Sequence, residues 1–178
     1  MDAFAALARN HKLKLIEDCA HAIETEYRGT KAGTLADFGC FSFYATKNVC
    51  TGEGGMILAR DEAAMKRLKM LALHGMSHDA WRRYSDAGFK HYQVVECGFK
   101  YNMMDLQAAL GIHQLARVER SWVRRREIVE RYRKELASLP ISFQADAPNH
   151  SRHAYHLFPI VLDGRRAPVT RDEFLDRM

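Results

Sequence analysis

Residues 17–57 read EDCAHAIETEYRGTKAGTLADFGCFSFYATKNVCTGEGGMI, and this stretch decides the fold. It begins at the end of a predicted strand, KLKLIED (12–18), which finishes in two carboxylates. It also holds an aromatic, alternating segment, CFSFYATK (40–47), a composition typical of strands. An amphipathic helix predicted over 2–10 leads into the first strand through a short turn. Helix, turn and strand in this order predict an α/β fold with a mostly parallel sheet flanked by helices.

The rest of the chain continues this alternation of helices and short strands. The predicted segments are a loop or hairpin (27–37), a tight turn (51–55), a strand (56–59), a helix capped by Asp61 (62–73), a long loop containing Gly75 and Gly88 (74–98), a helix broken near 118–121 and ended before Pro140 (103–138), a strand (156–162) and a helix starting near Thr170. The long helix changes from small and apolar to highly charged. We therefore predict that residues 1–118 are the second part of a large domain. Residues 119–178 would form a connecting helix and the start of a smaller α+β domain.

Composition excludes several classes of protein. No apolar run approaches the about 20 residues of a membrane span, and the N-terminus lacks the features of a secretory signal. The four cysteines show no CxxC spacing, which favours reduced thiols and a cytoplasmic location. His150, His153 and His156 are close together in HSRHAYH, but no cysteine or carboxylate cluster completes a site there. We predict no metal and no membrane partner.

Three polar residues occur where a ligand site of an α/β sheet is expected. Asp18 ends one predicted strand, Lys47 ends another, and Ser42 lies on the same strand as Lys47. Pyridoxal phosphate (PLP) needs a lysine amine for its resting imine and for moving protons, and a carboxylate against the pyridine nitrogen. It also needs hydroxyl and N–H donors for its phosphate. Asp18, Lys47 and Ser42 supply one group of each kind, which predicts a PLP site.

The same stretch resembles the core of the DegT/DnrJ/StrS family of sugar aminotransferases. The family pattern has EDAAHA or EDAAQA, then FSFxxTKN and TGEGG, and the likeness continues through HG (74–75) and GFKYNMMDLQAALGIHQL (98–115). It covers roughly residues 2–162. The resemblance implies a partial type I PLP-transferase fold. Complete members are longer and begin with a Gly-Thr phosphate turn and a stacking aromatic that we do not find here. We therefore expect a truncated chain.

The resemblance also implies a role for each matching residue. Asp18 would pair with the pyridinium nitrogen, and His21 would lie beside the ring and its 3′-oxygen. Ser42 would bind the phosphate. Lys47 would hold the cofactor and transfer the proton, and lysine rather than histidine at this position favours transamination over sugar dehydration. Asn102 would contact the cofactor phosphate of a neighbouring subunit. The division of this role between Lys100 and Asn102 stays open. Asn102 could also cap the helix that follows it.

By resemblance, the amino donor would be glutamate and the acceptor a nucleotide-linked keto sugar. The sequence FKYN is similar to a subgroup that includes the UDP-4-amino-4-deoxy-L-arabinose aminotransferase. The shared active site of the family implies a homodimer in the full-length form. Amino-sugar synthesis for lipopolysaccharide or another cell-surface polysaccharide would be the setting.

Two other interpretations remain. The chain could be a catalytically incompetent piece of such an enzyme, with cofactor residues but no complete pocket. It could also be a basic helical nucleic-acid binder built on residues 117–134, but glutamates are interleaved with the arginines and no known reader motif accompanies the charge. We therefore expect no nucleic-acid partner.

Overall fold

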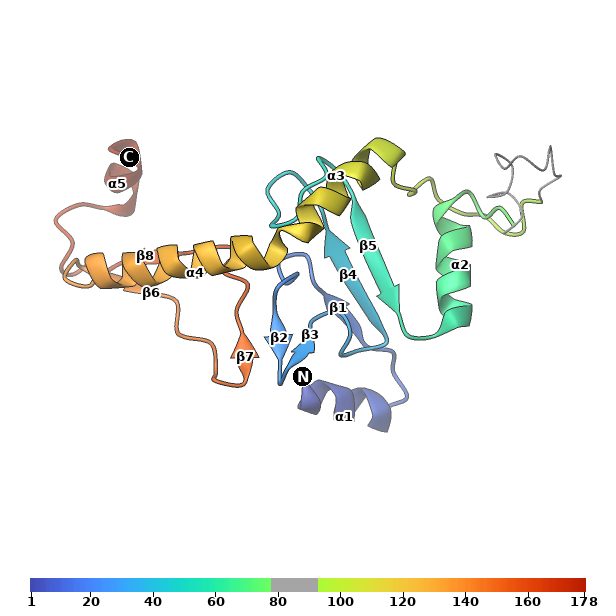
Figure 1. The fold of residues 1–178 in the computed structure, drawn as a ribbon. Helices are drawn as coiled ribbons and strands as arrows, with labels where there is room; N and C mark the ends of the chain where they lie inside the picture. Colours follow the sequence, from blue (N-terminus) through green and yellow to red (C-terminus); the bar gives the residue numbers. More distant parts are fainter. Residues whose placement is uncertain (78–92) are drawn as a thin grey trace.

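The central sheet joins three strands in the order β1–β4–β5 (Figure 1). These strands are β1 (Ile16–Asp18), β4 (Phe38–Ser42) and β5 (Gly55–Ala59). Strands β1 and β4 run parallel, whereas β4 and β5 are antiparallel. The chain returns from β4 to β5 through residues 43–54, and Gly52 and Gly54 adopt positive φ in the TGEGG segment that leads into β5. The α/β class is confirmed, but the sheet of the described residues is mixed rather than mostly parallel.

The computed structural model describes residues 1–77 and 93–178. The part of the predicted 74–98 loop over 78–92, with Gly88, lies outside the described residues. The helices of the described part are α1 (Asp2–Asn10), α2 (Glu62–Ala72), α3 (Asp105–Ala116), α4 (Val118–Glu135) and α5 (Arg171–Asp176). Among them, none combines the length and the apolar character that a membrane crossing requires. The predicted cap of α2 is confirmed, since the Asp61 carboxylate accepts the Ala64 N–H at 2.8 Å. The predicted break in the long helix lies at Arg117, between α3 and α4.

Two small antiparallel sheets complete the described structure. The hairpin of β2 (Glu26–Tyr27) and β3 (Thr30–Lys31) pairs with β7 (Ser151–Arg152), and β6 (Ile141–Phe143) pairs with β8 (Ile160–Leu162). The hairpin was one of two alternatives predicted for 27–37. Strands β6 and β7 were not predicted, because two or three residues carry too short a pattern to distinguish a strand from a loop.

The predicted strands over 12–18, 40–47 and 156–162 are longer than the observed ones. Before β1, the Leu15 N–H donates to the Asp37 carboxylate at 3.0 Å, so the ladder starts only at Ile16. After β4, the chain turns at once, and the Lys47 N–H donates to the Tyr44 carbonyl at 2.9 Å. A side-chain acceptor before β1 and a local turn after β4 therefore replace the strand pairing that the residue pattern alone would favour.

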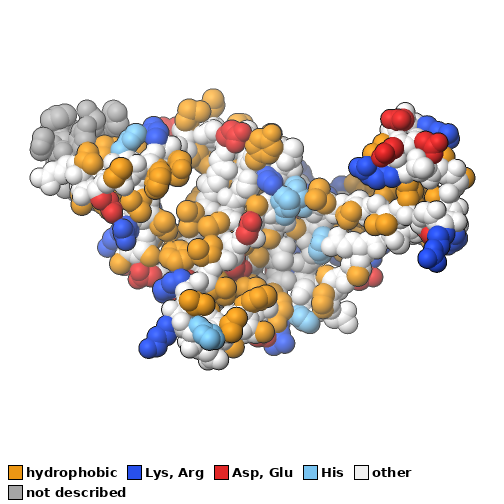
Figure 2. Space-filling view, turned by 180° about the vertical axis from the view of Figure 1, so that it is seen from behind, with side chains coloured by type: hydrophobic (Ala, Val, Ile, Leu, Met, Phe, Trp, Pro, Cys, Tyr) orange, Lys and Arg blue, Asp and Glu red, His pale blue; other side chains and the backbone are white. Residues whose placement is uncertain are grey.

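Few apolar side chains are fully buried in the described structure. The buried ones are Ala8, Cys19, Ala36, Val49, Val118, Val129 and Ala154. Larger apolar side chains lie at the surface, and Figure 2 shows them spread over the face opposite to the view of Figure 1. Two carboxylates are buried instead. That of Glu17 accepts backbone N–H groups from Gly33, Leu35 and Ala36, each at 2.8 Å, and so fixes the segment that leads into β4.

The close contact of Gly33 with Gly39 depends on both residues lacking a side chain. A Cβ added to Gly39 would lie 2.3 Å from the Gly33 Cα, and Gly33 adopts φ +84° beneath the Phe41 ring. The contact holds the loop before β4 against the strand itself.

We expect Gly39→Ala to lower the free energy of unfolding by about 1–3 kcal/mol, since backbone must move to admit the methyl group. Urea titration followed by circular dichroism measures this change. Gly164→Ala is the matched control, because a Cβ there meets nothing within 4 Å. Equal losses in the two variants would contradict the packing argument.

Candidate functional site

The carboxyl ends of β1 and β4 form the edge where the predicted site residues lie. Because the two strands are parallel neighbours, their ends fall at the same edge of the sheet. Asp18 is the last residue of β1 and Ser42 the last of β4. Lys47 follows five residues after β4, in the turn closed by the Tyr44 carbonyl. One carboxylate, one hydroxyl and one amine are therefore presented by adjacent segments.

The structure brings Lys47 and His21 into direct contact. The Lys47 Nζ lies 2.6 Å from the His21 Nε2. His21 reaches this position through a turn directly after β1, in which the Ala22 N–H donates to the Cys19 carbonyl at 3.0 Å. Within the same turn, an Asp18 carboxylate oxygen accepts the Ala20 N–H at 3.0 Å, and the Asp18 side chain stays open to solvent. The local turn thus orients Asp18 and His21 together.

Ser42 and Asn102 have local contacts. The Ser42 Oγ accepts the Tyr44 N–H at 3.4 Å. The Asn102 side-chain oxygen accepts from the Lys100 ammonium, and the cap of α3 is Met104 rather than Asn102. In the described part of the chain, no contact joins Asn102 to Lys47. Among the described residues, the Lys100–Asn102 pair has no hydrogen bond to the Lys47–His21 pair.

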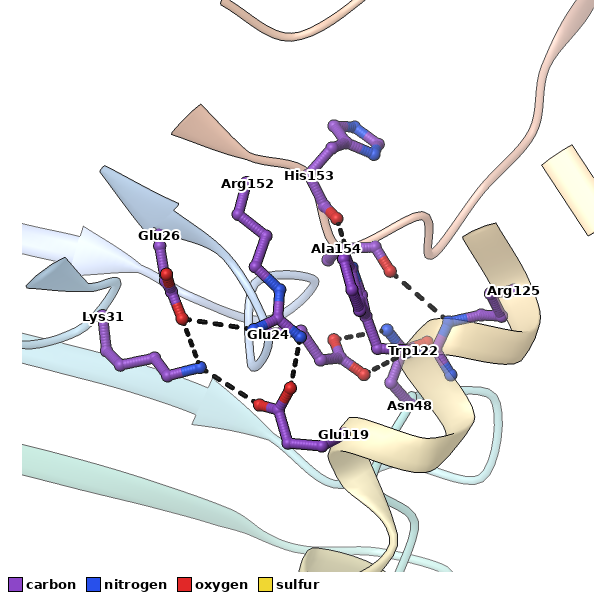
Figure 3. A network of polar contacts seen from close by, with 10 residues as sticks. All are labelled: Glu24, Glu26, Lys31, Asn48, Glu119, Trp122, Arg125, Arg152, His153 and Ala154. Carbon is purple, nitrogen blue, oxygen red and sulfur yellow. Dashed lines mark hydrogen bonds and ion pairs between the residues drawn. The ribbon is translucent and has the colours of Figure 1, made fainter. Parts of the chain in front are cut away.

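Sequence reasoning missed a set of polar residues behind His21. The ring of His156 lies against that of His21, with 4.1 Å between centroids, and its Nδ1 lies 2.8 Å from the Asn48 Oδ1. The Asn48 amide donates to Glu24 at 2.8 Å, and the Glu24 carboxylate binds the Arg125 guanidinium (Figure 3). Glu24 follows three residues after His21 and Asn48 follows Lys47. Their proximity to predicted site residues was the signal available in the sequence.

A second ionic network ties helix α4 to the hairpin and to β7 (Figure 3). Arg152 on β7 binds Glu26 and Glu119, and Lys31 binds the same two carboxylates. The Arg152 guanidinium also lies 3.7 Å from the centre of the Trp122 ring, a cation–π contact. These contacts hold α4, which carries Arg125, against the segments near the strand ends.

The electrostatics around the site follow from burial and from neighbouring charge. Burial lowers the pKa of His156, and the neighbouring His21, Lys47 and Arg125 lower it further. Burial also raises the pKa of the Cys19 thiol to about 11, with Glu17 and Asp18 adding to the shift. Cys19 therefore stays a thiol through neutral pH. Its contribution to the free energy of unfolding falls as the pH rises from about 9 toward 11, because the thiol ionises more readily in the unfolded chain.

A hollow of about 310 Å³ opens beside His21 and His156. It is lined by His21, Thr25, Gln144, His153, Ala154, His156, Leu157 and Pro159. In residues 1–77 and 93–178, His, Cys, Asp and Glu form no group of three that would hold a metal ion. The hollow is lined by imidazole, hydroxyl and amide groups.

The donor set at this edge fits pyridoxal phosphate. An amine that can form an imine, a carboxylate for a pyridinium and a hydroxyl for a phosphate come from adjoining segments. The sequence profile of the DegT/DnrJ/EryC1/StrS aminotransferase family matches residues 1–178. The chain belongs to this family. Members of the DegT/DnrJ/EryC1/StrS family are PLP-dependent.

Individual relatives agree with this membership. The spore coat polysaccharide biosynthesis protein SpsC of Bacillus subtilis is 46% identical over 175 residues, which cover 98% of this chain and 45% of SpsC. The aminotransferase TlmJ from Streptoalloteichus hindustanus superposes with a TM-score of 0.83 at 31% identity, over 98% of this chain and 45% of TlmJ. The PLP form of Spr1654 from Streptococcus pneumoniae gives 0.74 at 33% identity, over 85% of this chain and 38% of Spr1654. The chain thus spans less than half the length of these relatives.

Proposed function

We propose that this chain carries the lysine-bearing part of a PLP-dependent aminotransferase, which moves an amino group from glutamate to a nucleotide-linked keto sugar. The observation that carries the proposal is the contact of Lys47 with His21 at the sheet edge that Asp18 and Ser42 also border. Bound PLP would supply an electron sink for the carbon that gains or loses the amino group. The chain's own residues would bind the cofactor and move the proton.

Each predicted residue has a chemical task in this proposal. Asp18 would hold the proton on the pyridine nitrogen by charge, and Ser42 would donate its hydroxyl hydrogen to a phosphate oxygen. Lys47 would bond to the cofactor through Nζ and then carry a proton between two carbons as a free amine. His21, already in contact with Nζ, would lie beside the ring and take part in that proton movement. Together these residues bind, orient and transfer protons.

The substrate class rests on the family and on the relatives' functions. SpsC is described by its role in spore coat polysaccharide biosynthesis, and PseC of Helicobacter pylori, 26% identical, is an aminotransferase involved in the biosynthesis of pseudoaminic acid. The FKYN sequence at 99–102 supports the UDP-4-keto-sugar subgroup, with lipopolysaccharide or another surface polysaccharide as the destination. The net charge of +5 agrees with an anionic nucleotide-sugar.

The proposal includes a cytoplasmic homodimer in the full-length form. Asn102, with Lys100 beside it, would contact the cofactor phosphate of the partner copy. Residues 1–118 would be the later part of the PLP-binding domain, and 119–178 the connecting helix with the start of a smaller domain.

Covalent capture of the cofactor tests the proposal. Purified chain mixed with PLP is expected to turn yellow, and borohydride should then fix the cofactor on Lys47, located by peptide mass spectrometry. Labelling spread over exposed lysines, with no preference for Lys47, would overturn the assignment.

The same experiment separates the two alternatives. If this chain gives no colour but a version extended at the N-terminus does, the chain by itself is an incompetent piece of the enzyme. Salt-sensitive retention on DNA, without colour in either version, would favour the nucleic-acid binder.

A further inference from the structure

A continuous chain of polar contacts runs from helix α4 to the candidate catalytic lysine. Arg125 binds Glu24, whose side chain is completely buried. Glu24 accepts from the Asn48 amide, Asn48 contacts His156, and the His156 ring lies against the His21 ring at a tilt of 34°. Lys47 follows at 2.6 Å from His21. His156 comes from a segment more than a hundred residues distant from Asn48 in sequence, so tertiary structure alone brings it here.

The contacts fix which nitrogen of His156 carries its hydrogen. The Glu24 carboxylate, which binds the Arg125 guanidinium, accepts a hydrogen bond from Asn48, so the Asn48 group facing it is the NH₂. The Asn48 oxygen then faces the His156 Nδ1 at 2.8 Å and needs a donor. His156 is therefore the Nδ1–H tautomer, with its lone pair on Nε2.

Burial and the charges around His156 favour its neutral form. His21 faces it from the turn after β1, Lys47 from the turn after β4, and Arg125 from α4. Glu24 carries a nearby carboxylate, but this carboxylate accepts hydrogen bonds from Arg125 and Asn48 rather than from His156. With burial as the larger cause, these cations lower the pKa of His156. A neutral ring can lie 4.1 Å from His21 without repelling a positive charge that forms there.

We propose that His156 is a positioning residue for Lys47, acting through His21. Anchored on Asn48 by its Nδ1–H, the His156 ring holds the His21 ring so that Nε2 faces the Lys47 Nζ. In that orientation the His21 Nε2 accepts a hydrogen bond from the Lys47 Nζ. When Nζ bonds to an electrophile through its lone pair, His21 would take the proton that the nitrogen loses, and the positive charge passes to His21. The relevance of this step to catalysis rests on the proposed function, whereas the geometry does not.

The first test measures the tautomer without any cofactor. In ¹⁵N-labelled chain at pH 7, two-bond and three-bond proton–nitrogen spectra are expected to show His156 with a protonated Nδ1 and an unprotonated Nε2. A His156 that is doubly protonated at pH 7, or that carries its hydrogen on Nε2, would overturn the proposal. This readout needs no variant, so it does not depend on a substitution being tolerated.

The second test uses His156→Phe, which keeps an aromatic ring against His21 but removes the donor to Asn48. Trace acetylation of cofactor-free chain, with Lys66 as internal reference, measures the reactivity of Lys47. Loss of one hydrogen bond that orients His21 should lower the Lys47:Lys66 labelling ratio by about threefold to tenfold. A purely packing role for His156 predicts no change, since phenylalanine fills the space.

His150→Phe is the matched control, because His150 also contacts an aromatic ring, that of Tyr27, at 5.3 Å between centroids. Its labelling ratio is expected to equal that of the unmodified chain. An unchanged ratio in His156→Phe, with thermal unfolding unaltered, would disprove positioning. If the tautomer and the labelling difference are both found but PLP is never captured on Lys47, the proposed function fails and the role of His156 toward Lys47 is upheld.

Discussion

Replacing Lys47 with alanine is expected to lower the rate of amino-group transfer from glutamate by at least about 10²–10⁴-fold, the usual contribution of a positioned acid–base group. The substitution removes the amine that would bond to the cofactor and the group that would carry the proton. Asp18 and Ser42 remain at the same edge of the sheet, so PLP should still bind, but without a covalent bond. Loss of the borohydride-fixed adduct alongside retained, weaker binding of PLP is the expected signature.

The measurement is the appearance of the keto acid from glutamate in the full-length enzyme, together with mass spectrometry of the fixed adduct. Lys66→Ala serves as the control, because Lys66 is exposed and pairs with Glu62 one helical turn away. Turnover in Lys47→Ala equal to that in Lys66→Ala would remove Lys47 from the mechanism.

Glu24→Ala is expected to lower the free energy of unfolding by about 2–4 kcal/mol, close to the cost of breaking other buried ion pairs. The change leaves the Arg125 guanidinium without its anion and the Asn48 amide without its acceptor. Arg125 is about one quarter exposed, and water at that side offsets part of the cost. Guanidinium titration of the chain measures the loss.

A surface ion pair on the same helix provides the comparison. Glu127 pairs with Arg124 at 3.0 Å, and both side chains are at least half exposed. Glu127→Ala should therefore change the free energy of unfolding by less than about 0.5 kcal/mol. Similar losses for Glu24→Ala and Glu127→Ala would show that burial of Glu24 does not strengthen its role.

The helices followed from the sequence more closely than the strands. The α2 helix and its Asp61 cap, and the break between α3 and α4, lie where the apolar period and the cap signal place them. The strands are shorter than their aromatic patterns indicate, since Asp37 takes the N–H of Leu15 and the turn at Lys47 ends pairing early. The direction of β5 relative to β4 depends on the turn before β5. The strand pattern itself is the same for either direction.

For the site, the sequence could give chemical types but not side-chain partners. Asp18 and Lys47 were predicted from their places at strand ends and Ser42 from its place on the same strand as Lys47, and β1 and β4 end at a common edge. The contact of Lys47 with His21 was not predicted from spacing, because it depends on two turns that face each other. His156 was considered only as a metal ligand, since its position beside Asn48 results from tertiary packing.

The buried Glu24–Arg125 pair also constrains when the site can assemble. Its partners are 101 residues apart, and those of the His156–Asn48 contact are 108 apart. Closing loops of this size is slow and follows local structure formation. During synthesis, the strand and the lysine turn leave the ribosome well before helix α4 does. The surroundings of Lys47 therefore mature late, only after His156 has been made, more than a hundred residues after Asn48.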